Sequence, residues 1–244
     1  MSRRTDVRAI FFDAGNTLVR MNFAAVADRL RALGVTVTTD ALIRAERRAR
    51  VRLDEGHLAR STSSTETRST QDAYLRYVLD EVGVVDDAIV TALAGWRRDY
   101  NVPVGLWELA EPNAEPALAL ARAAGLRTAV ISNSNGSIRS SLTSLGLARH
   151  LELVIDSFEV GVEKPDPRIF RLGLDRMQLG PAQAVYVGDM YSIDVRGARA
   201  VGIDAILLDP EGCWGERDCL VAADVLSAVR LVVERYSAGT VTNG

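Results

Sequence analysis

Short apolar runs recur along the chain, and each ends near a polar residue. They cover residues 8–13, 128–132, 184–189 and 203–209, with a weaker run at 151–155. Uninterrupted runs of this kind are typical of strands in a parallel sheet that is covered on both faces, because neither face needs polar side chains. The pattern therefore predicts a sheet of buried strands.

Segments with the apolar spacing of helices lie between these runs. They cover residues 113–124, 137–145, 167–177, 192–201 and 222–236. Gly125, Gly146 and Gly202 follow three of them, as expected at helix C-termini. Pro167 opens a fourth, where a missing N–H costs nothing. Strands that alternate with helices predict right-handed crossovers and a doubly wound, Rossmann-like parallel sheet.

Residues 21–100 break this alternation. Four helical patterns follow one another, at residues 24–33, 40–57, 71–82 and 86–100, with no strand pattern between them. Thr39 and Asp86 are expected as N-caps, and the polar stretch 61–70 is expected to be a mobile loop. The sequence thus predicts an α/β core of residues 1–20 and 101–244, with an all-helical insert, residues 21–100, after the first strand.

Composition narrows the classes of partner. The net charge is −3, which gives no argument for nucleic acid or an anionic membrane. No apolar run approaches the roughly 20 residues that span a bilayer, and residues 1–8 lack the apolar stretch of a signal peptide. A cytoplasmic location is expected, and the sequence carries no signal for an oligomeric state. Cys213 and Cys219 fit no zinc or redox spacing and are expected to be packing residues.

Arginine accounts for nearly all of the basic residues, and lysine is almost absent. All 29 are arginines except Lys164. A chain that uses arginine for almost every cation and keeps one lysine indicates a position that needs a compact ammonium group. The arginine-rich stretch 44–52 is interpreted instead as a solvated helix face, because Glu46, Asp54 and Glu55 lie close by.

Polar side chains stand where the predicted strands end. In an open parallel sheet, the ligand crevice lies at the carboxyl ends of the strands. The residues expected there are Asp13, Ser132, Asn133, Asp189 and Asp194, with Lys164 in a nearby loop. Two carboxylates at adjacent strand ends offer the oxygen ligands of a hard cation that keeps several waters, which indicates Mg²⁺.

These groups together predict a site for phosphoryl transfer. The carboxylate of Asp13 can attack a phosphate whose charge a metal shields, and it then forms an acyl phosphate. The Ser132 hydroxyl, the backbone N–H groups of Ala14 and Gly15, and Lys164 can neutralise the phosphate oxygens. The expected ligand is a small phosphorylated molecule.

Four segments resemble the motifs of the haloacid dehalogenase-like superfamily. They are residues 11–18 (FFDAGNTL), 131–133 (ISN), 163–167 (EKPDP) and 188–194 (GDMYSID). The resemblance spans the whole core, and the helical insert looks like the cap of the subclass in which a cap follows the first motif. It implies a hydrolase whose cap closes over the site, excludes water and selects the substrate.

The resemblance also implies a role for each matching residue. Asp13 would be the nucleophile and a metal ligand, and Gly15 would offer its carbonyl oxygen to the metal. Ser132 would bind the phosphoryl group with Asn133 beside it, and Lys164 would hold Asp13 and the phosphate charge. Asp189 would bind Mg²⁺, and Asp194 would bind or orient the ion.

One position departs from the pattern of the family's phosphatases. Two residues after the nucleophile they carry a second Asp, the general acid and base, whereas this chain has Gly15. Loss of such a group typically costs ~10²–10⁴-fold in rate. Asp72, Glu46 and Asp99 from the helical insert are possible substitutes, and the sequence does not choose among them.

Three functions therefore remain open, and the sequence argues against a fourth, phosphonate cleavage. A slow Mg²⁺-dependent phosphatase retains the motif carboxylates and Lys164. A haloacid dehalogenase is compatible with Gly15, but that chemistry needs no metal and leaves Asp189 and Asp194 unexplained. Phosphonate cleavage requires a lysine in the cap, and residues 21–100 contain none. A binding or regulatory protein with a weakened site would bind a phosphate mimic without turnover.

Overall fold

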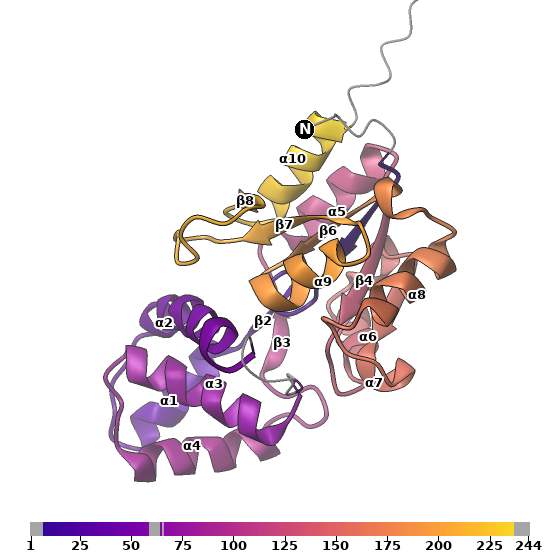
Figure 1. The fold of residues 1–244 in the computed structure, drawn as a ribbon. Helices are drawn as coiled ribbons and strands as arrows, with labels where there is room; N and C mark the ends of the chain where they lie inside the picture. The colour runs from indigo at the N-terminus through magenta and orange to yellow at the C-terminus, as the bar shows by residue number, and fades with distance from the viewer. Residues whose placement is uncertain (1–6, 59–63, 65, 237–244) are drawn as a thin grey trace, which may run out of the picture.

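A six-stranded parallel sheet forms the centre of the computed structural model, which describes residues 7–58, 64 and 66–236 (Figure 1). Its strands run in the order β5-β4-β1-β6-β7-β8, and every neighbouring pair is parallel. The strands are β1 (Ala9–Phe12), β4 (Arg127–Ser132), β5 (Leu153–Asp156), β6 (Ala184–Gly188), β7 (Asp204–Leu208) and β8 (Leu220–Ala222). The doubly wound parallel sheet predicted from the sequence is confirmed.

Helices cover both faces of the sheet. One face packs against α5 (Ala114–Ala123) and α10 (Val225–Tyr236), and the other packs against α8 (Pro167–Met177) and α9 (Arg196–Arg199). Successive side chains of β1 alternate between the two apolar clusters, so each face of this central strand is buried. The first strand therefore reads as a continuous apolar run, and its end is held rigidly.

A helical unit is attached to the sheet by a two-stranded ribbon (Figure 1). Strand β2 (Val19–Met21) pairs antiparallel with β3 (Trp107–Ala110). The elements between these strands are α1 (Phe23–Ala32), α2 (Thr39–Leu53), the short π-helix η1 (Asp54–Leu58), α3 (Arg68–Glu81) and α4 (Asp87–Asp99). The unit has its own apolar core, which includes Leu30, Leu42 and Leu93. The described residues between β2 and β3 contain no strand, as the sequence predicted.

Smaller elements complete the core. They are α6 (Ile138–Ser144), the 3₁₀ turns η2 (Ala148–His150) and η3 (Pro181–Gln183), α7 (Ser157–Val160) and the π-helix η4 (Tyr191–Val195). Within the described ranges, no helix combines the length and apolar character needed to cross a bilayer.

Several boundaries differ from those expected. The strands β2, β3 and β8 were not predicted, because β2 and β8 have only three residues each and β3 is only partly buried along its length. Residue 222 ends β8, so the last helix begins at 225, and the predicted helix 192–201 is divided into η4 and α9. Of the predicted loop 61–70, residues 61–63 and 65 lie outside the described residues, and α3 already begins at Arg68.

The two expected N-caps have different outcomes. Asp86 caps α4, where its side chain accepts a hydrogen bond from the N–H of Ala88, as predicted. The prediction for α2 is wrong by one position, because Thr38 is the cap and Thr39 is the first helical residue. Thr38 accepts from the N–H of Ala41 at 3.2 Å.

Candidate active site

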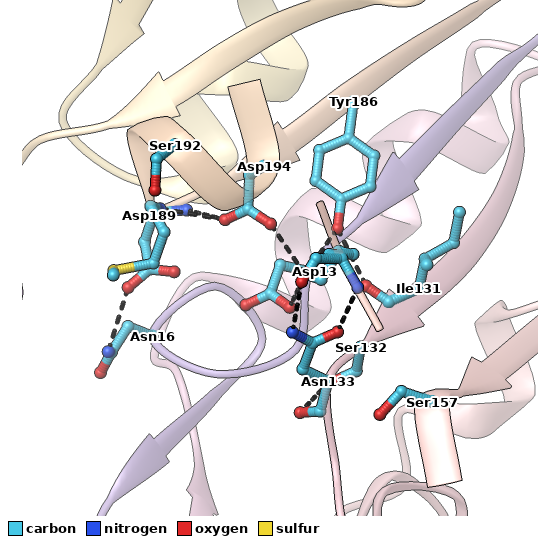
Figure 2. Close-up of polar contacts among 12 residues, drawn as sticks. Asp13, Asn16, Ile131, Ser132, Asn133, Ser157, Tyr186, Asp189, Ser192 and Asp194 are labelled. Carbon is cyan, nitrogen blue, oxygen red and sulfur yellow. Dashed lines mark hydrogen bonds and ion pairs between the residues drawn. The ribbon is translucent and has the colours of Figure 1, made fainter. Parts of the chain in front are cut away.

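The ends of three adjacent strands bring the predicted residues together. Asp13 follows β1, Ser132 ends β4 and Asp189 follows β6, and these strands are neighbours in the order β4-β1-β6. Figure 2 shows Asp13 between the pair Asp189 and Asp194 on one side and Ser132 on the other. Residues far apart in the sequence therefore meet at one edge of the sheet, as expected for a parallel fold.

Lys164 is buried among three oxygen atoms. Its Nζ donates to Asp13 Oδ1 at 2.5 Å, to Asp194 Oδ1 at 2.7 Å and to the Tyr186 hydroxyl at 2.9 Å. Burial alone lowers the pKa of Lys164, but the carboxylates of Asp13 and Asp194 raise it well above its ordinary value. The lysine is thus an ammonium ion that fixes the orientation of Asp13.

The amide of Asn133 positions this lysine. Its Nδ2 donates to the Lys164 carbonyl oxygen at 2.9 Å, and its Oδ1 accepts from the Lys164 N–H at 2.7 Å. Asn133 thereby ties the loop that carries the lysine to the end of β4. The Ser132 hydroxyl donates to the Asn133 carbonyl oxygen at 3.2 Å and lines the cavity above the site.

Three buried carboxyl groups converge beside the lysine. One oxygen each from Asp13, Asp189 and Asp194 lies within 4.8 Å of the other two. Burial raises the pKa of Asp13 to about 6, against the lowering effect of Lys164. Burial also raises the pKa of Asp189 well above its ordinary value, against the lowering effect of Arg50. A divalent cation between these groups would keep both ionised, so the donor set fits Mg²⁺.

Asp194 is held on both of its oxygens. Oδ1 accepts from Lys164, and Oδ2 accepts from the backbone N–H groups of Asp189 at 3.1 Å and Met190 at 2.9 Å. Gly188 makes this arrangement possible, because a Cβ atom there would lie 2.4 Å from the Asp194 carboxyl. Asp194 is therefore placed to orient the backbone around Asp189, whereas Asp13 and Asp189 each retain an oxygen for a cation.

A buried arginine from the helical unit reaches the same carboxylates. Arg50 Nη1 donates to Asp189 Oδ2 at 2.9 Å, and its Nε donates to Glu46 Oε1 at 2.9 Å. The side-chain amide of Asn16 donates to Glu46 Oε1 and to Asp189 Oδ2, at 3.1 Å each. The Tyr74 hydroxyl donates to Glu46 Oε1 at 2.7 Å. Helix α2 thus contacts the site directly.

This contact corrects in part the interpretation of residues 44–52 as a solvated face, on which Arg44, Arg48 and Arg52 are indeed exposed. Glu46 and Arg50 are both buried, and they follow the helical spacing of the apolar residues Leu42, Ala49 and Leu53. The periodicity of α2 therefore places them on its packed face. That spacing was the signal in the sequence that could have identified them.

The space beside Gly15 is bounded by an aromatic ring. A Cβ atom at Gly15 would lie 3.5 Å from the Trp107 indole and 3.9 Å from Asp13 Oδ2. The three expected substitutes for the missing acid do not line the cavity above the site. Glu46 accepts hydrogen bonds from Arg50 and Tyr74. Asp72 forms an ion pair with Arg97 at 3.4 Å, and Asp99 is exposed on α4. None of the three is placed to act on a bound substrate.

A cavity of about 640 Å³ lies over Asp13. The sheet contributes Ser132, Asn133, Lys164 and the carboxylates to its wall, and the helical unit contributes polar residues that the sequence did not single out. Those residues are Glu66, Arg68, Thr70, Gln71, Tyr74, Arg97 and Arg98. The arrangement can hold a small anionic molecule against a fixed carboxylate nucleophile.

The chain is similar in sequence to known hydrolases. A family model described as haloacid dehalogenase-like hydrolase matches residues 7–202. The protein named haloacid dehalogenase-like hydrolase domain-containing protein 3 from Mus musculus is 33% identical over 214 residues, covering 85% of this chain and 84% of the relative. A protein named glyceraldehyde 3-phosphate phosphatase from Methanothermobacter thermautotrophicus is 31% identical over 214 residues, covering 87% and 90%.

Solved structures share the fold. A crystal structure described as a dehalogenase with an intermediate complex has a TM-score of 0.61 at 21% identity, covering 93% of this chain and 97% of the other. At this identity the likeness concerns the arrangement of the chain and does not extend to the reaction.

Proposed function

Because the chain belongs to the haloacid dehalogenase-like hydrolase family, we propose that it is a Mg²⁺-dependent phosphatase that acts on a small phosphorylated metabolite through an aspartyl phosphate on Asp13. One observation carries the proposal: the Asp13 carboxylate is fixed by a buried ammonium group beside two further carboxyl groups. A nucleophile held beside such a donor set suits attack on phosphorus.

Separate groups of residues would bind the metal ion and the phosphoryl group. Asp13 and Asp189, with the Gly15 carbonyl oxygen, would hold Mg²⁺, and Asp194 would orient them. When bound, the ion would supply positive charge that offsets the negative charge of the phosphate, so that the carboxylate of Asp13 can approach it. Ser132, Lys164 and the N–H groups of Ala14 and Gly15 would neutralise the phosphoryl oxygens. Asn133 would support Lys164 through the loop backbone.

We further propose that residues 21–100 form a cap domain over a core domain of residues 1–20 and 101–244. The cavity is lined from both sides, which supports a cap that encloses the substrate. Closure of such a cap excludes water and sets which substrates fit. The cytoplasmic location expected from the sequence stays a prediction.

Two observations favour a phosphatase over a haloacid dehalogenase. The relative from Methanothermobacter thermautotrophicus, which covers nearly the whole chain, is named as a phosphatase. The carboxyl groups of Asp189 and Asp194 converge on Asp13, an arrangement that attack on carbon does not need. Gly15, which lacks the usual acid, is the observation that favours the second candidate, a phosphate-binding or regulatory protein with weak turnover.

A phosphate-release assay tests these functions against one another. The purified chain is incubated with a panel of small phosphomonoesters, with Mg²⁺ or with chelator, beside the matched variant Asp13→Asn. We expect Mg²⁺-dependent release by the wild-type chain and none by the variant. Binding of beryllium fluoride without turnover would favour the regulatory function. Chloride release from 2-chloropropionate in the presence of chelator would favour dehalogenation.

A further inference from the structure

The proposed reaction needs a proton donor that the sheet does not provide. Gly15 has no side chain, and the Trp107 indole lies 3.5 Å from the position of a Cβ atom there. An alkoxide leaving group requires a proton as its bond to phosphorus breaks, and the attacking water must then lose one. The group that carries this proton has to line the cavity from another direction.

One carboxyl group on the cavity wall has no other assigned role. Among the described residues, the carboxyl side chains that line the cavity are Asp13, Glu66, Asp189 and Asp194. Asp13 is the nucleophile, Asp189 is bound by Arg50, and Asp194 is bound by Lys164. Glu66 is the remaining one, and it comes from the helical unit just before α3.

A hydrogen-bond relay holds the Glu66 segment against the core. The Glu66 N–H donates to Ser64 Oγ at 3.0 Å, and Ser64 Oγ donates to Glu163 Oε1 at 2.7 Å. Glu163 directly precedes Lys164 in the chain. Thr70 Oγ1 also donates to the Ser64 carbonyl oxygen at 2.9 Å. The segment that carries Glu66 is therefore tied to the same loop that positions the nucleophile.

We propose that Glu66 is the general acid and base of this site, in place of the acid that Gly15 lacks. The inference rests on the proposed phosphatase function. In the first step, Asp13 forms a bond to phosphorus, the bond from phosphorus to the leaving oxygen breaks, and Glu66 gives its proton to that oxygen. In the second step, the Glu66 carboxylate takes a proton from water as the water oxygen attacks phosphorus. The bond to Asp13 then breaks, which restores Asp13 and releases phosphate.

The surroundings of Glu66 suit both proton transfers. Burial and then, in decreasing order of effect, the nearby carboxyls of Glu163, Asp156 and Asp13 together raise its pKa to about 7. The positive charge of Arg97 on α4 interacts electrostatically with Glu66, and Gln71 Nε2 donates to Glu66 Oε2 at 3.5 Å. A group that titrates near neutral pH can both donate and accept a proton at low cost.

The test compares two kinds of ester in the variant Glu66→Gln. For an alkyl phosphate, whose leaving group needs a proton, we expect kcat/KM to fall by ~10²–10⁴-fold. For a nitrophenyl phosphate, whose leaving group departs without a proton, kcat/KM should change far less. The wild-type pH profile of kcat should lose its limb near neutral pH in the variant, and the acyl phosphate should accumulate.

The matched control is Asp99→Asn, which removes one carboxylate from the same helical unit. Asp99 is exposed and does not line the cavity, so its variant should keep the wild-type pH profile. Glu66→Asp should recover part of the rate lost in Glu66→Gln. Equal losses for both esters, or an unchanged pH profile, would overturn the assignment of Glu66.

These outcomes are separate from those of the proposed function. Absence of phosphate release by the wild-type chain would contradict both the phosphatase function and the role of Glu66. An active wild type with an equally active Glu66→Gln variant would contradict only the role of Glu66. If the variant does not fold, a carbon-13 titration of the wild-type carboxyl groups decides. A glutamate that titrates near about pH 7 supports the assignment, and glutamates that all titrate at ordinary values overturn it.

Discussion

At the scale of single residues, Lys164 has the most demanding environment. Its ammonium group bonds two carboxylates and a hydroxyl while almost fully buried. We expect Lys164→Met to leave Asp13 and Asp194 without a counter-charge, which costs about 3–5 kcal/mol of unfolding free energy in urea titrations. We expect Lys164→Arg to lose at least ~10²-fold in kcat, because a planar fork cannot reach the three oxygens at once.

A matched control is available on α8. Arg171→Met also removes one positive charge, but Arg171 is exposed, so stability and kcat should stay close to the wild type. Full activity of the variant Lys164→Arg would contradict the requirement for a compact ammonium.

Gly188 gives a second prediction at this scale. A Cβ atom there would overlap the Asp194 carboxyl at 2.4 Å. Gly188→Ala should therefore displace Asp194 from Lys164 and from the N–H groups after β6, and weaken Mg²⁺ affinity ~10–100-fold by calorimetry. Gly180→Ala is the control, since a Cβ at Gly180 makes only ordinary contact at 3.7 Å. Equal Mg²⁺ affinities of the two variants would show that Asp194 does not orient the metal site.

At the scale of secondary structure elements, helix α2 links the helical unit and the proposed metal site. Arg50 donates to Asp189 at 2.9 Å, so its positive charge lies beside an expected metal ligand. Removing that charge in Arg50→Met should tighten Mg²⁺ binding on the order of tenfold, which is ~1.4 kcal/mol. It should also lower stability, because Glu46 loses its buried partner.

Arg47→Met on the same helix is the control for this prediction. Arg47 pairs with Glu211 at 2.5 Å in a partly exposed contact away from Asp189, so its loss should leave Mg²⁺ affinity unchanged. Weaker Mg²⁺ binding in Arg50→Met would indicate that Arg50 supports the metal site, contrary to a simple charge effect.

The elements also show what the sequence could predict. The core strands β1, β4 and β6 were predicted because burial on both faces leaves an unbroken apolar run. The ribbon of β2 and β3 was missed because its pairing joins residues that lie far apart in the chain and depends on tertiary contact. Among the described residues, the α-helices α1 to α4 of the insert were predicted in order, since each has a long amphipathic pattern, but the predicted helix 40–57 ends in the separate π-helix η1.

At the scale of the whole molecule, the candidate site has two halves that differ in how far the sequence predicts them. The sheet half, with Asp13, Lys164 and Asp189, follows from strand ends that a parallel sheet must bring together. The other half, with Glu66 and Arg50, depends on how the helical unit docks on the core. The helical spacing of α2 places Arg50 on a packed face, but no local pattern shows what that face packs against, so these residues were not assigned to the site from the sequence.

Contacts between the halves make the stability of the molecule depend on pH. Burial raises the pKa of Glu66 from its ordinary 4.5 to about 7, and burial raises the pKa of Asp54 from 3.8 to about 6. Asp54, in η1, accepts hydrogen bonds from Ser192 N and Oγ at 3.1 and 2.5 Å. Between the ordinary and raised values, the folded chain holds more protons than the unfolded chain. The contribution of these groups to unfolding free energy is therefore greatest at low pH and falls as pH rises from about 4 to about 7.

Substitutions that mimic the protonated forms should reduce this dependence. We expect Glu66→Gln to have a higher Tm than the wild type at about pH 8, where the wild-type carboxyl is charged and half-buried, and to lose that advantage at about pH 4. Asp54→Asn should behave in the same way over a lower range that ends near about pH 6. Scanning calorimetry from about pH 4 to 8 measures both, with Asp99→Asn, exposed on α4, expected to follow the wild type throughout. If the difference in Tm between Glu66→Gln and the wild type does not change across this range, the carboxyl of Glu66 has an ordinary pKa, and the helical unit does not bury it against the core.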